Sequence, residues 1–175
     1  LHGQTKDALA KTKAGSWEYD IIIPGYKCNM TDIMASIGLV QLDRYPKLLE
    51  RRLELVEKYN KGFEGSKVKP LVHNTKDHKS SNHLYITHVE GATFEQRGEI
   101  ITKMAERGIS CNVHYKPLPL LTAYKNLGFD MNDYPNAYSY YVNEVTLPLH
   151  TRLSDEDIEV IVENFKEVIA EVVGE

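Results

Sequence analysis

Long hydrophobic runs and basic clusters are absent from this 175-residue sequence, and cysteine is scarce. No apolar segment approaches the roughly 20 residues that a membrane-spanning helix needs. The net charge of −4 and the pI near 6.0 argue against nucleic acid as the main partner. The two cysteines, Cys28 and Cys111, lie far apart, and no signal peptide is visible. We therefore expect reduced thiols in a cytoplasmic protein that has no membrane partner.

Motifs of common catalytic and metal sites are also missing. The seven histidines form no HxxxH or HExxH pair, so we expect no metal site. The sequence has no glycine-rich phosphate loop, no dinucleotide-binding fingerprint and no nucleophile elbow. Cys111 has no flanking signature of a cysteine nucleophile, and we interpret it as a small core residue. The chain by itself therefore offers no catalytic residue.

What the sequence does contain is the composition of a globular protein. Hydrophobic residues make up 42% and charged residues 26%, as in ordinary folded domains. A length of 175 residues suffices for one domain or for one and a half. The first residue is Leu1 rather than Met, and the stretch before Tyr19 has neither a helix cap nor a clear strand pattern. We expect a piece of a longer protein, because a processed or truncated chain would begin in this way.

The stretch Pro24–Leu42 predicts a turn followed by the start of a long helix. Thr31 suits the N-cap, and the aspartate after it lies where the helix dipole favours a carboxylate. Apolar residues at helical spacing, with small residues between them and Gly38 in the interior, predict a helix packed closely on both sides. The periodicity continues past Pro46 to Gly62, so we expect either one long bent helix or two helices in series.

The rest of the chain alternates between strand and helix patterns. Strands are expected over Glu18–Ile23, His83–Val89, Ile109–Tyr115 and Glu144–Leu149. Helices are expected after the capping boxes of Thr93 with Gln96 and Ser154 with Asp157, and in shorter form over Leu120–Gly128 and Ala137–Asn143. Gly108 should end the first of these helices, and Gly65–Ser81 should be a loop. We therefore expect a small, mainly antiparallel sheet with helices on one face, which is an α+β fold.

Two of these helices have apolar stripes that predict their buried faces. In the helix after Thr93 the stripe is Ile100, Ile101, Met104 and Ala105. In the last helix it is Ile158, Ile161, Val162, Phe165, Val168 and Ile169.

Polar groups gather in two places where ligand chemistry is plausible. Lys27, Cys28 and Asn29 precede the long helix, and a lysine with an amide at a helix mouth suits a phosphate or a carboxylate. The alternative is a solvated turn. The segment Asn112–Pro119 presents a His-Tyr-Lys triplet on a proline-stiffened support. The alternative interpretation of this segment is a strand end with ordinary exposed side chains.

Together these stretches resemble the C-terminal portion of a nucleotide-sugar aminotransferase of the DegT/StrS family, which has the aspartate-aminotransferase fold of type I. The matching stretches, in the family's order, are His2-Gly3, Gly25–Arg44, Arg51–Tyr59, His83-Leu84-Tyr85, Val113-His114-Tyr115 with Pro117, Leu147-Pro148-Leu149 and Ser154–Ile169. The resemblance covers nearly the whole chain. Its most specific block is Gly25–Leu42.

The resemblance implies a pyridoxal 5'-phosphate enzyme that moves an amino group from glutamate to a nucleotide-linked keto-sugar, for polysaccharide or lipopolysaccharide sugars. Similar enzymes are homodimers in which the segment before the helix contacts the cofactor phosphate of the partner. That role would fall on Asn29 or Lys27, although this triplet departs from the family's usual order of asparagine first and arginine third. Substrate binding would fall on His114 and Tyr115. A second histidine often follows the family's proline, and Pro119 stands there instead, which implies a changed substrate contact.

The resemblance also implies three parts. Residues 1–30 would be a remnant of the large cofactor-binding domain, residues 31–62 a connecting helix, and residues 63–175 the small C-terminal domain. The family's Schiff-base lysine, its aspartate for the pyridine nitrogen and its phosphate-binding hydroxyls would all lie upstream of Leu1. We therefore expect this chain alone to be inactive, with no cofactor covalently bound. The alternative is a stand-alone α+β ligand-binding or regulatory dimer module.

Overall fold

The computed structural model describes residues 21–174, and the chain divides into two compact units, residues 1–45 and 46–175. Half of the strand expected at Glu18–Ile23, residues 18–20, lies outside the described residues. Within the described range, Ile21 occupies a bridge position and the two isoleucines after it are not in a strand. No helix within the described range is both long and apolar enough to cross a membrane.

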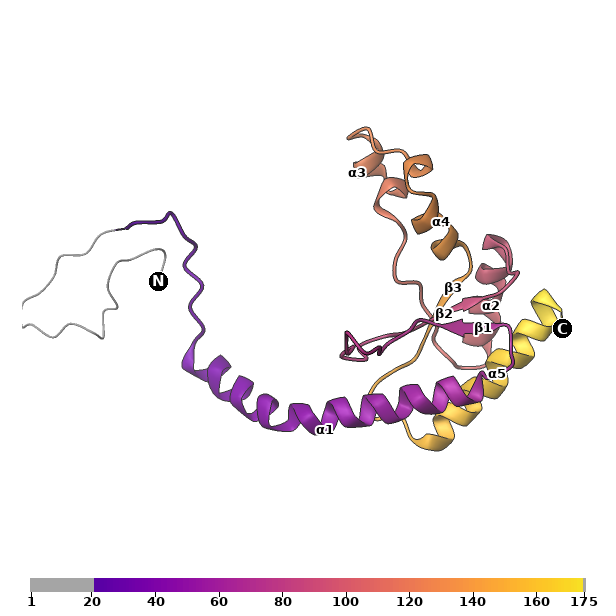
Figure 1. The fold of residues 1–175 in the computed structure, drawn as a ribbon, viewed down its shortest axis with the longest axis horizontal. Coiled ribbons are helices and arrows are strands. Elements are labelled where there is room, and N and C mark those ends of the chain that lie inside the picture. The colour runs from indigo at the N-terminus through magenta and orange to yellow at the C-terminus, as the bar shows by residue number, and fades with distance from the viewer. Residues whose placement is uncertain (1–20, 175) are drawn as a thin grey trace, which may run out of the picture. The chain divides into compact units, whose positions relative to one another are not determined.

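In the first unit, the segment up to Thr31 leads into helix α1, which spans Asp32–Gly62 and continues into the second unit (Figure 1). The Oγ1 atom of Thr31 accepts a hydrogen bond from the Met34 backbone N–H at 3.4 Å, as expected of an N-cap. Pro46 lies inside this helix, so one continuous helix replaces the alternative of two in series.

The beginning of α1 is exposed, whereas its periodicity predicts close packing on both sides. Ile33, Ile37 and Val40 are 74%, 53% and 57% exposed. A Cβ atom added at Gly38 would meet no atom of the described residues within 4 Å. The apolar stripe is therefore present, but the described residues do not cover it.

A three-stranded antiparallel sheet forms the centre of the second unit, with strand order β1-β2-β3. The strands are β1 (Val68–Pro70), β2 (Tyr85–Val89) and β3 (Glu144–Leu147). Strand β1 corrects the expected loop over 65–81. It has only three residues, too few to give an alternating pattern, and pairing with β2 holds it in place.

The strand expected at Ile109–Tyr115 is also wrong. Only Asn112 pairs with the sheet, exchanging two backbone hydrogen bonds with Thr146. The next two backbone N–H groups are bound by side chains instead. Val113 donates to the Asn112 side chain at 2.8 Å, and His114 donates to the Glu144 carboxylate at 2.9 Å. A segment whose backbone is bound in this way cannot continue a strand.

Two helices begin at the predicted capping boxes. Helix α2 (Phe94–Glu106) has reciprocal bonds between Thr93 and Gln96, and helix α5 (Asp155–Val173) has them between Ser154 and Asp157. All six residues predicted for the buried stripe of α5 are buried. In α2, Ile100 and Met104 are buried and Ile101 is half-buried, but Ala105 is exposed. Arg97, which was not predicted for this stripe, is buried on α2. Its guanidinium lies over two aromatic rings, at 4.7 Å from the centroid of Phe94 and 4.8 Å from that of Tyr141.

The hydrophobic core lies between one face of the sheet and the helices, which confirms the α+β class. The C-terminal part of α1 contributes Leu55, Val56 and Tyr59, and the core continues through α2 and α5. The Tyr59 ring stacks on Tyr85 with centroids 4.4 Å apart, and its hydroxyl donates to the Pro148 carbonyl at 2.8 Å. This packing leaves the opposite face of the sheet free of helices from the core.

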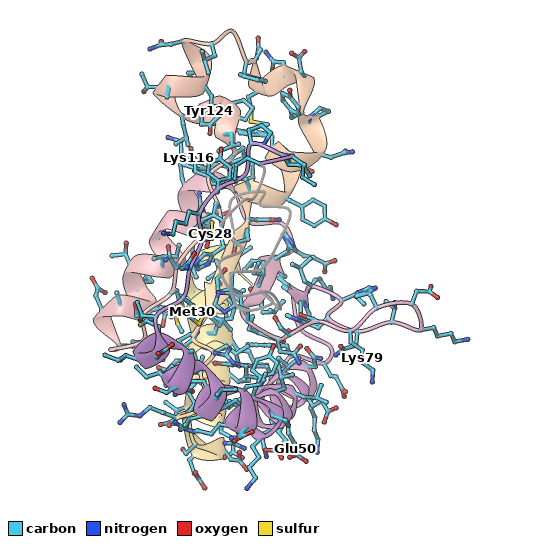
Figure 2. The ribbon with its side chains drawn as sticks, turned by 90° about the vertical axis from the view of Figure 1, so that its left-hand side faces the viewer. Cys28, Met30, Glu50, Lys79, Lys116 and Tyr124 are labelled. Carbon is cyan, nitrogen blue, oxygen red and sulfur yellow. The ribbon has the colours of Figure 1, made fainter. Side chains whose placement is uncertain are left out.

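Between Asn112 and β3 the chain forms an arm of short helices that stands out from the sheet (Figure 1). Its elements are η2 (Leu118–Leu120), α3 (Thr122–Lys125), η3 (Met131–Asp133) and α4 (Pro135–Val142). Helix α4 covers most of the helical turn expected at Ala137–Asn143. Helix α3 lies within the short helix expected over Leu120–Gly128. Figure 2 shows Lys116 and Tyr124 on this arm, and Lys79 on the long loop between β1 and β2.

Candidate functional site

A hollow of about 250 Å³ lies on the face of the sheet opposite the core. Strand β2 presents Ile86 and His88 to this face, since its alternate residues Tyr85, Thr87 and Val89 are buried in the core. Helix α4 and the segment after Asn112 complete the walls. The lining residues are Leu71, Ile86, His88, His114, Tyr115, Pro117, Ala137, Tyr140, Tyr141 and Glu144.

Glu144 is the buried charged group of this hollow, with 4% of its surface exposed. Its Oε2 atom accepts the backbone N–H of His114 at 2.9 Å, and its Oε1 atom accepts the hydroxyl of Thr146. Both carboxylate oxygens are therefore bound to donors, as a buried carboxylate requires. The side chain fixes the beginning of the His114–Pro117 segment to strand β3.

His114 and Tyr115, the predicted substrate-binding pair, both line this hollow. Their rings meet edge to face, with centroids 4.6 Å apart, and the peptide bond between them is cis. The Nδ1 atom of His114 is buried and has no hydrogen-bond partner within residues 21–174. Tyr115 is 73% exposed. One polar atom of the pair is therefore buried and unpaired within the described residues.

His88 is a site residue that the sequence analysis did not identify. Its Nδ1 atom lies 3.3 Å from Oδ1 of Asn143, and its ring meets Tyr140 edge to face at 4.6 Å. Its Nε2 atom is buried and lacks a partner among the described residues. The alternation of HLYITHV could have placed His88 on the open face with Ile86, but the pattern does not say what covers that face.

A second hollow, of about 410 Å³, adjoins the first and shares Leu71 and Ile86 with it. Its walls include His73, His78 and His83, from the loop between β1 and β2 and the residues just before β2. Burial lowers the pKa of His73, so this ring is uncharged at neutral pH. Within residues 21–174, no cluster of three or more histidine, cysteine or acidic side chains is placed to hold a metal ion.

Lys27 and Asn29, the predicted cofactor-binding residues, lie in the first unit just before α1. Both are exposed, and neither has a hydrogen bond to another residue of the described range. An ammonium and an amide N–H are both donors, so the pair can bind an anion such as a phosphate. His114 and Tyr115 belong to the other unit.

The two cysteines differ in environment. Cys28 is exposed between Lys27 and Asn29, whereas Cys111 is half-buried against the core, and both thiols are free. Burial raises the pKa of Cys111 to about 12. Cys111 is therefore a protonated packing residue, as predicted.

Comparison with known proteins finds this chain similar to sugar aminotransferases. The model of the DegT/DnrJ/EryC1/StrS aminotransferase family matches residues 1–166. A spore coat polysaccharide biosynthesis protein, SpsC of Bacillus subtilis, is 35% identical over 97% of this chain and 44% of its own length. The UDP-4-amino-4,6-dideoxy-N-acetyl-beta-L-altrosamine transaminase of Campylobacter jejuni, strain 81-176, is 28% identical over 98% of this chain and 43% of its own length.

Among solved structures, the PMP form of Spr1654 from Streptococcus pneumoniae, named as a sugar aminotransferase, has 66% identity and a TM-score of 0.87. The match covers 98% of this chain and 43% of that protein. The chain thus spans less than half the length of the relatives that it matches.

Proposed function

This chain belongs to the DegT/DnrJ/EryC1/StrS aminotransferase family, and we propose that it forms the C-terminal part of a sugar aminotransferase that uses pyridoxal phosphate. The proposed reaction moves the amino group of glutamate to the keto group of a nucleotide-linked sugar, for polysaccharide or lipopolysaccharide sugars. The family match over residues 1–166 carries this proposal. The name of the Campylobacter relative supports a UDP-linked sugar as substrate.

Lys27 and Asn29 are the proposed contacts of the cofactor phosphate. Pyridoxal phosphate is the cofactor of this family, and relatives have been solved with it and with its amino form. When bound, the cofactor carries the amino group from the donor to the acceptor. The exposed donors of Lys27 and Asn29 suit a phosphate dianion. In the proposed cytoplasmic homodimer, they would hold the phosphate bound in the partner subunit.

His114 and Tyr115 are the proposed substrate contacts. The Glu144 carboxylate and the sheet hold the segment that carries them, so the two rings are presented from a fixed support. Tyr115, which is 73% exposed, is open to a substrate group. The role of these side chains is to bind and orient the sugar. The division into residues 1–30, 31–62 and 63–175 stays a prediction.

The 175-residue chain alone is proposed to be inactive, because none of its lysines stands in a context that matches the cofactor-binding lysine. Incubation with pyridoxal phosphate, reduction with borohydride and mass analysis should give no stoichiometric modification of one lysine. A single labelled lysine together with release of 2-oxoglutarate from glutamate would overturn this. A parent protein that contains the family's lysine should release 2-oxoglutarate with a UDP-linked keto-sugar. A stand-alone binding module would not.

A further inference from the structure

Helix α4 is the part of the arm that needs support from outside itself. It has eight residues, and no side chain caps its N-terminus. Six of the eight are exposed, whereas Tyr141 and Val142 are half-buried. Isolated helices shorter than roughly 12–15 residues are marginal in water, because so few hydrogen bonds do not offset the cost of nucleation. Contacts with the rest of the second unit must therefore hold α4 in place.

Tyr141 joins α4 to helix α2. The centroid of its ring lies 4.8 Å from the Cζ atom of Arg97 and 5.7 Å from the centroid of the Phe94 ring. The Cζ atom of Arg97 lies 4.7 Å from the Phe94 centroid. Because these three distances are similar, the two rings and the guanidinium form one compact cluster rather than a stack. The cluster connects the end of α4 to the beginning of α2.

Arg97 is a buried cation without an anionic partner in the described part of the chain. Its exposed fraction is 5%, and within residues 21–174 its guanidinium has neither an ion pair nor a hydrogen bond. Burying such a charge normally requires a counter-ion, because the protein interior does not replace the water around it. The negative faces of the Phe94 and Tyr141 rings take that place here. The buried cation therefore depends on Tyr141, and the position of Tyr141 depends on the cation.

The helix that this cluster holds forms one wall of the hollow on the open face of the sheet. Tyr141 lines the hollow, together with Ala137 and Tyr140 of the same helix. Tyr140 is 59% exposed, and its ring meets that of His88 edge to face at 4.6 Å. Because Tyr141 is tied to α2, the residue before it is held against strand β2. The wall therefore depends on Arg97, which does not itself line the hollow.

We propose that Arg97 is a positioning residue, which holds helix α4 against α2 through its cation–π contact with Tyr141 and so keeps the α4 wall of the hollow in place. The charge of Arg97 is essential to this role. A neutral side chain of the same length would fill the space but would leave the tyrosine ring without its electrostatic partner. The use of this wall in substrate binding rests on the proposed function, whereas the anchoring of α4 is a property of the chain alone.

Hydrogen exchange of the 175-residue chain, read by mass spectrometry on peptides from α4 and α5, measures the anchoring. The Arg97→Met variant keeps an unbranched side chain of similar length and removes the charge. Its α4 amides should exchange about three- to thirtyfold faster than in wild type, the range that corresponds to a desolvated cation–π contact. Amides of α5 should keep the wild-type rate, because an apolar residue in place of a buried charge is often neutral for the fold. Unchanged exchange in α4, or equal acceleration in α4 and α5, would overturn the proposal.

Tyr141→Leu tests the other side of the contact, and it does so even where Arg97→Met does not fold. This variant should accelerate exchange in α4, and adding Arg97→Met to it should bring no further acceleration, because both changes remove the same interaction. Additive acceleration would contradict the proposed pairing. Arg97→Lys keeps a cation and should recover part of the protection. Arg107→Met is the matched control, since Arg107 at the end of the same helix pairs with Glu167 and Glu171 of α5, and it should leave α4 unchanged.

The rings of His88 and Tyr140 report on the wall itself. Their protons should give nuclear Overhauser effects in the wild-type chain, and these should weaken in Arg97→Met and persist in Arg107→Met. Effects of full intensity in Arg97→Met would rule out a role of Arg97 in shaping the hollow. None of these measurements needs cofactor or substrate. Their failure is therefore distinct from a failure of the transaminase assay of the parent protein, which tests the proposed function.

Discussion

Glu144 lies beneath the proposed substrate segment, and both of its carboxylate oxygens accept hydrogen bonds from the chain. The Glu144→Gln substitution turns one of these acceptors into an NH₂ group that faces a donor. We expect a loss of about 1–3 kcal/mol in the free energy of unfolding, the usual cost of leaving a buried group unpaired. Urea unfolding of the 175-residue chain measures this loss. Glu163→Gln, at an exposed position on α5, should change stability by less than about 0.5 kcal/mol. Equal effects would contradict the assigned role of Glu144.

Asp155 makes the stability of the second unit depend on pH. Lys58 at 3.0 Å and Arg51 at 2.9 Å lower the pKa of its carboxyl below the ordinary 3.8. A carboxyl whose folded pKa is depressed stabilises the fold above its unfolded pKa and loses this effect as pH falls through the folded pKa. The Asp155→Asn variant should therefore be less stable than wild type at pH 7 and approach it below about pH 4. Urea midpoints between pH 7 and pH 3 measure this convergence, and a difference that stays constant would contradict it.

Among individual residues, the sequence predicted only part of the candidate site. His114 and Tyr115 could be selected because they are polar residues at the start of a proline-rich segment. His88 and Glu144 could not, because their roles depend on the pairing of β2 with β3, which places these two residues opposite each other. Register of this kind arises from tertiary packing rather than from local residue types.

Among elements, those with strong local signals were predicted and those held by tertiary contacts were not. The capping boxes at Thr93 and Ser154 fix where α2 and α5 begin, because both bonds of each box form between residues three apart. Strand β1 and the segment after Gly108 were predicted wrongly. In both cases, residues distant in sequence decide where the backbone hydrogen bonds go. For β1 they are the residues of β2, and for the segment after Gly108 they are Thr146 and Glu144.

Two glycines of α1 should respond oppositely to alanine. A Cβ atom at Gly62 would lie 2.9 Å from two side-chain atoms of Val162 in α5, whereas none of the described atoms lies within 4 Å at Gly38. Gly62→Ala should destabilise the chain by about 1–3 kcal/mol through overpacking. Gly38→Ala should stabilise α1 by up to about 1 kcal/mol through helix propensity. Urea unfolding measures both changes. Adding Val162→Ala should recover part of the loss at Gly62, and an additive double variant would argue against this contact.

For the molecule as a whole, the exposed stripe at the start of α1 should cause self-association. Ile33, Ile37 and Val40 recur at helical spacing and are each more than half exposed. Large exposed apolar patches mark interaction surfaces or aggregation sites. Sedimentation of the 175-residue chain should show mass increasing with concentration, and Val40→Glu should reduce this increase. Val160→Glu, at a 52% exposed valine on α5, is the matched control. An equal effect of the two variants would mean that association is not specific to this stripe.

The contrast between the two thiols gives the chain a built-in place for a spectroscopic reporter. Cys28 is exposed, while Cys111 is half-buried with its pKa raised to about 12, so a maleimide dye near neutral pH should attach to Cys28 alone. The dye would then lie directly between Lys27 and Asn29. Fluorescence from one fully native sequence could follow the arrival of pyridoxal phosphate, or of a second subunit, without introducing or removing any cysteine.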